Sequence, residues 1–215
     1  MASRSLSDLV GWEAFLHGVF AIAITLLVLD IRVPALEANA DGSALVHSLV
    51  ELWPRYLAYV LGFMYVGTYW LNTNRVLRLL RGVDHWALVI GLIYLMLVAA
   101  VPFVTGLLAE YIQQGGGRDQ VAAVVFNGWM LLLAAMAAAF VRYVTHRRRL
   151  LHPGLDMAAL GTWIRLATVA PAIWLIALAA AFFASATVAL IVDVAILLLF
   201  LREVPIGDGE AAPGK

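Results

Sequence analysis

The sequence predicts an all-α integral membrane protein with six transmembrane helices per subunit. Of its 215 residues, 64% are hydrophobic and 13% are charged, whereas an average soluble domain is roughly half apolar and about a quarter charged. The hydrophobic residues gather in six continuous runs, close to the roughly 20 residues that a helix needs to cross a bilayer. Because these runs do not alternate with period two, they favour helices over the strands of a membrane barrel.

Composition and motifs exclude several other classes of protein. The 14 basic and 14 acidic residues balance, so no basic surface is predicted for a nucleic-acid partner. The chain has no cysteine, which excludes disulfides, thiol nucleophiles and thiolate metal sites. Its five histidines lack metal-ligand spacing, and no catalytic or nucleotide-binding motif is present. We therefore expect neither an enzyme nor a cofactor or resident metal.

The expected helices follow the apolar runs in order, at about residues 14–31, 46–80, 86–108, 121–143, 160–183 and 185–201. The second is the longest, because helical-looking sequence extends its apolar centre at both ends. The fifth and sixth are separated by almost nothing, so a very tight turn must join them. We expect one membrane domain over residues 1–215, with a flexible tail at 203–215.

Loop charge predicts the orientation of these helices. With six spans, both termini and the second and fourth loops lie on one side. That side carries eleven of the 14 basic residues, namely Arg4, Arg75, Arg78, Arg81, Arg142, Arg147, Arg148, Arg149, Arg165, Arg202 and Lys215. The other side carries Arg32, Arg55 and Arg118. We therefore expect a multi-pass protein of the cell membrane with both termini cytoplasmic, and with the cluster at Arg147–Arg149 touching anionic lipid headgroups.

The first helix is apolar on every face, so protein or lipid must surround it. At 100° per residue, Ile22, Leu26 and Leu29 fall within one narrow stripe, which Gly18 extends by a turn. Thr25 lies beside this stripe, and His17 lies roughly 140° away from it. The helix therefore combines an aliphatic seam and a flanking hydroxyl with a polar residue on the opposite side.

The run Gly18–Asp30, with the sequence GVFAIAITLLVLD, resembles the first-helix signature of prokaryotic homologues of transmembrane protein 175, the lysosomal potassium channel. The resemblance continues through Trp53-Pro54, Tyr69–Asn72, Arg75 and Pro102–Thr105. It covers about the first 110 residues, and the remainder of the chain is similar in hydropathy alone.

The resemblance implies a homotetramer in which four copies of the first helix line a potassium-permeable pore. In that reading Ile22 forms the narrow constriction, Leu26 and Leu29 form further rings towards the outside, and Thr25 supplies a hydroxyl layer. An aliphatic ring too narrow for a hydrated ion gates by dewetting. From the residues alone, a second interpretation stays open, in which the three aliphatic side chains only pack against neighbouring helices.

The chain departs from the family pattern at two places. Where the family has an Arg four residues before a Phe-Ser-Asp triplet, this sequence has Gly11 and Phe15–His17. Where the family tends to have paired histidines after a tryptophan of the second helix, Trp70 is followed by Leu71–Asn74. Our hypothesis is that His17 faces the second and third helices and bonds to Asn72, Asn74 or another polar neighbour. A histidine there either makes gating pH-sensitive or is only structural.

Asp193 lies in the middle of the sixth helix, where an ionisable group is costly unless it is paired or wet. One interpretation is a functional acid, which with His17 would serve a proton-coupled secondary transporter, the alternative to a channel. The others are a neutral acid hydrogen-bonded at a helix contact, or a pair with Arg165. A non-conducting membrane scaffold is a third possible function.

Overall fold

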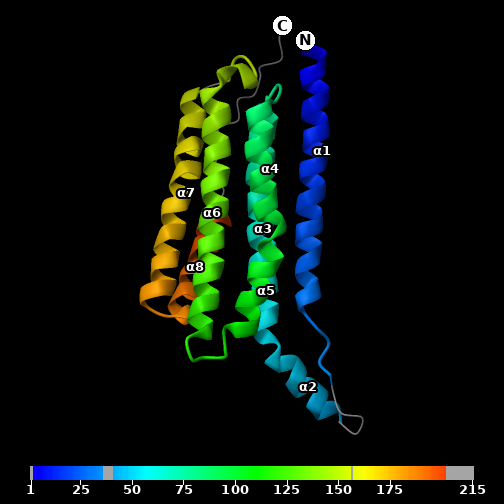
Figure 1. Cartoon of the computed structure of the whole chain (residues 1–215), viewed down its shortest axis with the longest axis vertical. Coiled ribbons are helices and arrows are strands. Elements are labelled where there is room, and N and C mark those ends of the chain that lie inside the picture. The colour runs from blue at the N-terminus through cyan, green and yellow to red at the C-terminus, as the bar shows by residue number, and fades with distance from the viewer. Residues whose placement is uncertain (1, 36–40, 156, 202–215) are drawn as a thin grey trace.

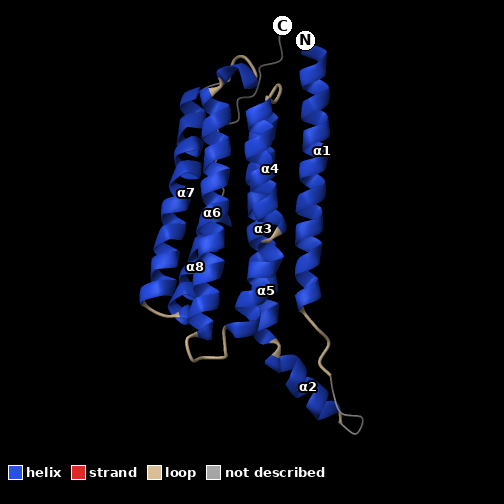
Figure 2. Ribbon diagram, in the orientation of Figure 1, coloured by secondary structure: helices blue, strands red, loops and turns tan. Residues whose placement is uncertain are grey.

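The structure is a computed structural model that describes residues 2–35, 41–155 and 157–201. Its helices are α1 (Ala2–Leu26), η1 (Leu27–Asp30), α2 (Gly42–Glu51), α3 (Trp53–Leu79), α4 (His85–Ala99), α5 (Val101–Tyr111), α6 (Arg118–His146), η2 (Arg148–Leu150), α7 (Met157–Phe183) and α8 (Ala186–Leu201). Figure 1 shows an elongated bundle with α1 at one edge and α7 at the opposite edge. The described part of the chain is all helix and connecting loop (Figure 2), which confirms the predicted fold class.

Three spans of the described chain are long and apolar enough to cross a bilayer: Leu9–Asp30, His85–Tyr111 and Arg118–His146. Ala167–Phe183 and Ala186–Phe200 are apolar but shorter. Together with α3, these segments form the lengthwise bundle, and α2 lies at an angle beyond one end of it (Figure 1).

The structure divides the expected helix at 46–80 into α2 and α3, which are separated at Leu52. Asp41 begins α2, because its Oδ1 accepts a hydrogen bond of 2.9 Å from the N–H of Ala44. Pro54 lies in the first turn of α3. Proline has no N–H to bond the carbonyl four residues earlier and its ring clashes with it, so the two helices cannot run on as one.

A second proline divides the expected helix at 86–108. Ala100 separates α4 from α5, and Pro102 lies in the first turn of α5. The two pieces still form one continuous apolar span from His85 to Tyr111. The break therefore interrupts the helix without ending the apolar span.

The other helices differ from expectation mainly at their ends. α1 begins at Ala2, well before the expected start near residue 14, and its last turn tightens into η1. α7 and α8 are joined by Ala184 and Ser185 alone, and the Ser185 hydroxyl accepts a 3.2 Å hydrogen bond from the Val188 N–H. The proposed tail at 203–215 lies outside the described residues.

Glycines allow close contact where α1 and η1 meet their neighbours. α1 packs against α3, α4 and α5. A Cβ added at Gly91 of α4 would overlap Cζ2 of Trp12 on α1. One added at Gly62 of α3 would lie 2.9 Å from Leu27 Cδ2. A larger residue at Gly91 would push α1 away from α4, and one at Gly62 would displace the side chains of Leu27 and Thr105.

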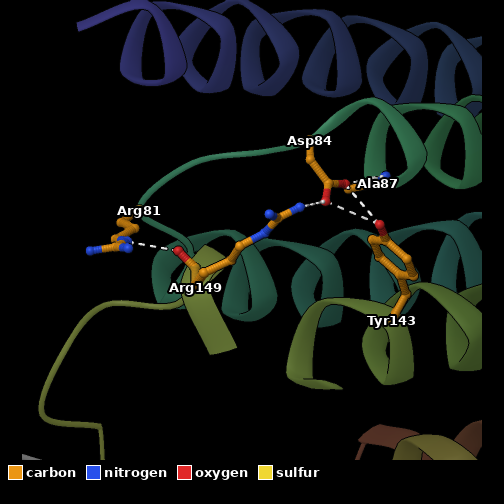
Figure 3. A network of polar contacts seen from close by, with 5 residues as sticks. All are labelled: Arg81, Asp84, Ala87, Tyr143 and Arg149. Atoms are coloured by element: carbon orange, nitrogen blue, oxygen red, sulfur yellow. Dashed lines mark hydrogen bonds and ion pairs between the residues drawn. The ribbon is translucent and has the colours of Figure 1, made fainter. Parts of the chain in front are cut away.

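A hydrogen-bonded clasp joins the α3–α4 loop to the α6–α7 loop. The N–H of Arg81 donates to the carbonyl of Leu150 at 2.9 Å, and the N–H of His152 donates to the carbonyl of Leu79 at 3.0 Å. The Nε of Arg81 also donates to the Arg149 carbonyl at 2.8 Å (Figure 3). These bonds hold the ends of α3 and α6 together.

Asp84 is the centre of the side-chain contacts in this clasp (Figure 3). It begins α4 by accepting from the N–H of Ala87 at 3.0 Å, and its Oδ2 accepts from Tyr143 Oη at 3.0 Å and from Arg149 Nη2 at 3.2 Å. Partial burial raises the pKa of Asp84, but the hydrogen bonds from Ala87, Arg149 and Tyr143 outweigh it and hold the pKa below its usual value.

Candidate functional site

The first helix presents one buried face and one exposed face. The buried face consists of large or tightly packed residues, each at most 9% exposed: Leu9, Trp12, Leu16, Phe20, Ala23 and Leu27. On the other face Ile22 is 60% exposed, Leu26 41% and Leu29 67%. Packing within the subunit therefore does not account for these three side chains.

The exposed stripe stays aligned although the helix changes type. Ile22 and Leu26 are four residues apart in α1, and Leu29 lies in the 3₁₀ turn η1. In a 3₁₀ helix, residues three apart lie directly above one another, so Leu29 follows Leu26 on the same side. Towards the other end the stripe continues with the exposed Gly18, where an added Cβ would meet no atom within 4 Å.

Thr25 is exposed beside the stripe, and its hydroxyl is held against α1 itself. The Oγ1 atom donates to the carbonyls of Ala21, at 3.0 Å, and Ile22, at 2.9 Å. Because the hydrogen points back to the helix backbone, the oxygen lone pairs point outward. The hydroxyl is therefore presented as an acceptor, the polarity that a cation requires.

His17 links α1 to α3. Its Nε2 lies 2.8 Å from Oδ1 of Asn74, so Nε2 carries the hydrogen that this bond needs. The imidazole also lies 6.1 Å from the Trp70 ring, between centroids. Of the two asparagines considered from sequence, Asn74 makes the contact, whereas Asn72 lines a cavity between α3 and α6–α8.

Asp193 lies in a separate place, between α8 and α6. It is 1% exposed, and its Oδ2 is 3.4 Å from the Nδ2 of Asn127, which also donates to the Ala123 carbonyl at 3.0 Å. The Tyr65 hydroxyl donates to the backbone carbonyl of Asp193. Ion pairs among the described residues do not include one between Asp193 and the exposed Arg165.

An ionic contact that the sequence analysis did not identify lies at the far end of the stripe. Arg55 of α3 donates through Nη1 to the Asp30 carbonyl at 3.1 Å and pairs through Nη2 with Glu110 of α5 at 2.7 Å. Gly106 leaves room for the Asp30 carboxylate, since a Cβ there would lie 2.8 Å from Oδ2. These contacts tie η1 to the bundle next to Leu29.

Comparisons with known proteins bear on the part of the chain that carries this face. A sequence model of the family described as the endosomal/lysosomal potassium channel TMEM175 matches residues 12–102, which contain the exposed stripe. A potassium channel of Streptomyces collinus is 44% identical over 160 residues, covering 72% of this chain and 74% of that protein. This chain belongs to the TMEM175 family. The family is one of ion channels, so the prediction that the chain is not an enzyme is confirmed.

A further relative and a solved structure extend the match beyond the first helices. A potassium channel of Chamaesiphon minutus is 38% identical over 170 residues, covering 79% of this chain and 82% of that protein. The crystal structure of a lysosomal potassium-selective channel TMEM175 homolog from Chamaesiphon minutus superposes with a TM-score of 0.79 at 34% identity. It matches 90% of this chain and 96% of that one, so the similarity includes the helices after about residue 110, whose sequence resembles the family in hydropathy alone.

Proposed function

We propose that this TMEM175-family chain is the subunit of a homotetrameric potassium channel whose pore is lined by α1. The observation that carries the proposal is the exposed stripe of Ile22, Leu26 and Leu29 on a helix whose opposite face is buried. The relatives in Streptomyces and Chamaesiphon are named potassium channels, which supports potassium as the permeant ion.

The place of α1 in the bundle supports a shared pore. α1 lies at an edge of the subunit (Figure 1) and packs against α3, α4 and α5 on one side only. Closed rotational symmetry is the usual arrangement of identical subunits. Four such edges turned to one axis would bring four copies of the exposed stripe together, with the remaining helices outside.

Ile22 forms the narrowest ring of this pore, and Leu26 and Leu29 form the rings beyond it. A narrow aliphatic ring empties of water and blocks ions when closed. When the ring widens enough for a partly hydrated ion, potassium passes more readily than sodium because it loses water at lower cost. The outward lone pairs of the Thr25 hydroxyl replace part of the hydration that the ion loses in the ring.

The proposed orientation places both termini in the cytoplasm of a cell-membrane protein. Eleven of the 14 basic residues belong to that side, and basic loops remain cytoplasmic during insertion. The clasp around Asp84 lies on the same side, and the basic cluster at Arg147–Arg149 faces the lipid headgroups there.

The two titratable groups of the transporter alternative occupy unconnected places. His17 bonds to Asn74 between α1 and α3, whereas Asp193 bonds to Asn127 between α8 and α6. Hydrogen bonds among the described residues do not link the two. We infer that Asp193 holds α8 to α6 and that His17 positions the pore helix, which favours the channel.

Reconstitution into liposomes separates the channel from its alternatives. With a potassium gradient, a channel gives flux that does not saturate at low concentration and needs no proton gradient. Asp193→Asn keeps the hydrogen bonding and removes the ionisable group, so a channel retains its flux. Proton-linked, saturable uptake that Asp193→Asn abolishes would identify the transporter, and folded tetramers without flux would identify a scaffold.

A further inference from the structure

A cavity of about 320 Å³ lies between α3 and α4 on one side and α6, α7 and α8 on the other. This volume is within the range of pockets that bind small molecules. Its lining comes from these five helices and not from α1, so the proposed pore does not include it. Thr68, Tyr69, Asn72, Thr73, Arg75, Val76, Tyr94, Ala134, Ala137, Phe140, Val141, Ala167, Ala170, Ile173, Leu199 and Phe200 line it.

The two walls of this cavity differ in chemistry. Every polar lining residue comes from α3 or α4, and α6, α7 and α8 contribute only aliphatic and aromatic side chains. Alanines such as Ala137 and Ala170 stand where larger residues would fill the space. A ligand that fits must therefore be mostly hydrocarbon and must carry a polar group on the α3 side.

The polar group is expected to be an anion. Arg75 lines the cavity, and the lining contains no acidic residue. Hydrogen bonds and ion pairs among the described side chains leave Arg75 out. A separate recess between α6 and α7 is lined by Arg142, Tyr143, Thr145, His146 and Ile164. Arg75 is thus the charged group of a largely apolar cavity whose lining holds no carboxylate.

The depth of Arg75 matches a lipid headgroup. Four residues, or about 6 Å of helix rise, separate Arg75 from the end of α3 at Leu79. A guanidinium at this height reaches the boundary between hydrocarbon and headgroups. A soluble anion gains nothing from the apolar wall, whereas a phospholipid supplies both a charged head and an acyl chain.

We propose that this cavity binds one anionic phospholipid, with its phosphate on Arg75 and an acyl chain between α6, α7 and α8. The neighbouring residue Asn74 bonds to His17 of α1, so the lipid site lies one residue from the contact between α3 and the first helix.

Native mass spectrometry of the purified full-length protein tests this inference. Palmitoyl-oleoyl phosphatidylglycerol, palmitoyl-oleoyl phosphatidylcholine and soluble glycerol phosphate are added separately at matched concentrations. We expect one phosphatidylglycerol per subunit, bound about tenfold more tightly than phosphatidylcholine. Both lipids have a phosphate, but the choline cation of phosphatidylcholine cancels the net negative charge that attracts Arg75. Glycerol phosphate should not compete with the lipid.

Two pairs of variants separate the headgroup from the chain. Arg75→Gln should abolish the preference for phosphatidylglycerol, while Arg78→Gln, an exposed arginine one turn later on α3, should keep it. Ala137→Phe should fill the cavity and weaken both lipids about tenfold, while Ala135→Phe, on the exposed side of α6, should not.

Three results would overturn the proposal: equal binding of the two lipids by the unmodified protein, an unchanged preference in Arg75→Gln, or competition by glycerol phosphate, which would indicate a free-phosphate site. If the Ala137→Phe variant does not fold, the comparison of Arg75→Gln with Arg78→Gln still tests the proposal. Lipid binding is measured without ion flux, so a failure of the channel proposal leaves this result intact, and the reverse also holds.

Discussion

At the scale of single residues, the contact between His17 and Asn74 is a polar link between the first helix and the bundle. The imidazole Nε2–H donates to the Asn74 amide oxygen over 2.8 Å. Removing the donor leaves that oxygen unpaired in a partly buried place, which costs about 1–3 kcal/mol. The link therefore contributes stability as well as orientation.

We predict that His17→Ala lowers the melting temperature of the protein in detergent, and that His17→Gln, whose amide N–H still donates, lowers it less. If His17 also controls the gate, potassium flux should differ between about pH 5 and pH 8, the range in which histidines act as switches in other proteins. That difference should vanish in His17→Gln, which has no ionisable side chain. Flux independent of pH in the unmodified protein would leave His17 a purely structural role.

A second residue, Asp84, predicts how the clasp between the loops responds to acid. Its pKa lies below the usual value of 3.8, so the folded state binds the proton less tightly than the unfolded chain does. The stability that the carboxylate supplies is therefore complete above about pH 4 and is lost as the pH falls through the lowered pKa.

Asp84→Ala removes both the charge and the cap of α4, so we expect a loss of about 1–2 kcal/mol at neutral pH. Asp84→Asn still accepts from the Ala87 N–H and should lose less. The measurement is thermal unfolding from pH 7 to pH 3: the difference between the unmodified protein and Asp84→Asn should shrink in acid. A constant difference over this range would show that the carboxylate charge does not stabilise the clasp.

At the scale of elements, the contact between α1 and α4 depends on the absence of a side chain at Gly91. A methyl group there overlaps the indole of Trp12, a rigid and buried ring. Overpacking of this kind costs about 1–3 kcal/mol. The expected consequence is a displacement of the pore helix from its support.

We therefore predict that Gly91→Ala lowers the melting temperature and alters potassium flux. Gly67→Ala on α3 is the matched control, because an added Cβ there meets no atom within 4 Å and alanine is the better helix former. Equal melting temperatures for the two variants would contradict the close contact between Gly91 and Trp12.

The elements also show which features hydropathy can predict. Continuous apolar runs predict six spans, because a helix that crosses lipid needs a continuous apolar sequence. Hydropathy does not predict the breaks at Leu52 and Ala100. Those breaks come from Pro54 and Pro102, whose missing N–H and ring clash act whatever the hydropathy of the neighbours. The prolines were therefore the available signal for both divisions.

The sequence also predicts some features of the candidate site and not others. A rotation of 100° per residue predicts that Ile22, Leu26 and Leu29 share one face of the helix. It does not predict that this face is the exposed one, because the helix is apolar on every face. Only the packing of the opposite face shows that the stripe is exposed. The pair of Arg55 and Glu110 joins residues 55 apart in sequence, and no local pattern predicts such a contact.

At the scale of the whole molecule, the proposed tetramer brings the exposed faces of α1 together. The chain has no cysteine, so a single introduced cysteine reports contacts between subunits alone. We predict that Ile22→Cys gives disulfide-linked dimers under mild oxidation, since this side chain is 60% exposed on the proposed axis. Its neighbour Ala23, 1% exposed, should give none as Ala23→Cys. Dimers from Ala23→Cys but not Ile22→Cys would exclude the axis.

The channel proposal is tested most directly by the ring at Ile22, measured as potassium and sodium flux into liposomes. Ile22→Asn makes the narrowest ring polar, so the ring should stay wet, with a raised leak and a lower ratio of potassium to sodium flux. Ile176→Asn is the matched control, because Ile176 is 65% exposed on α7, at the opposite edge of the subunit (Figure 1). It should leave both fluxes unchanged. Identical fluxes and ion ratios in Ile22→Asn and the unmodified protein would contradict a pore lined by α1.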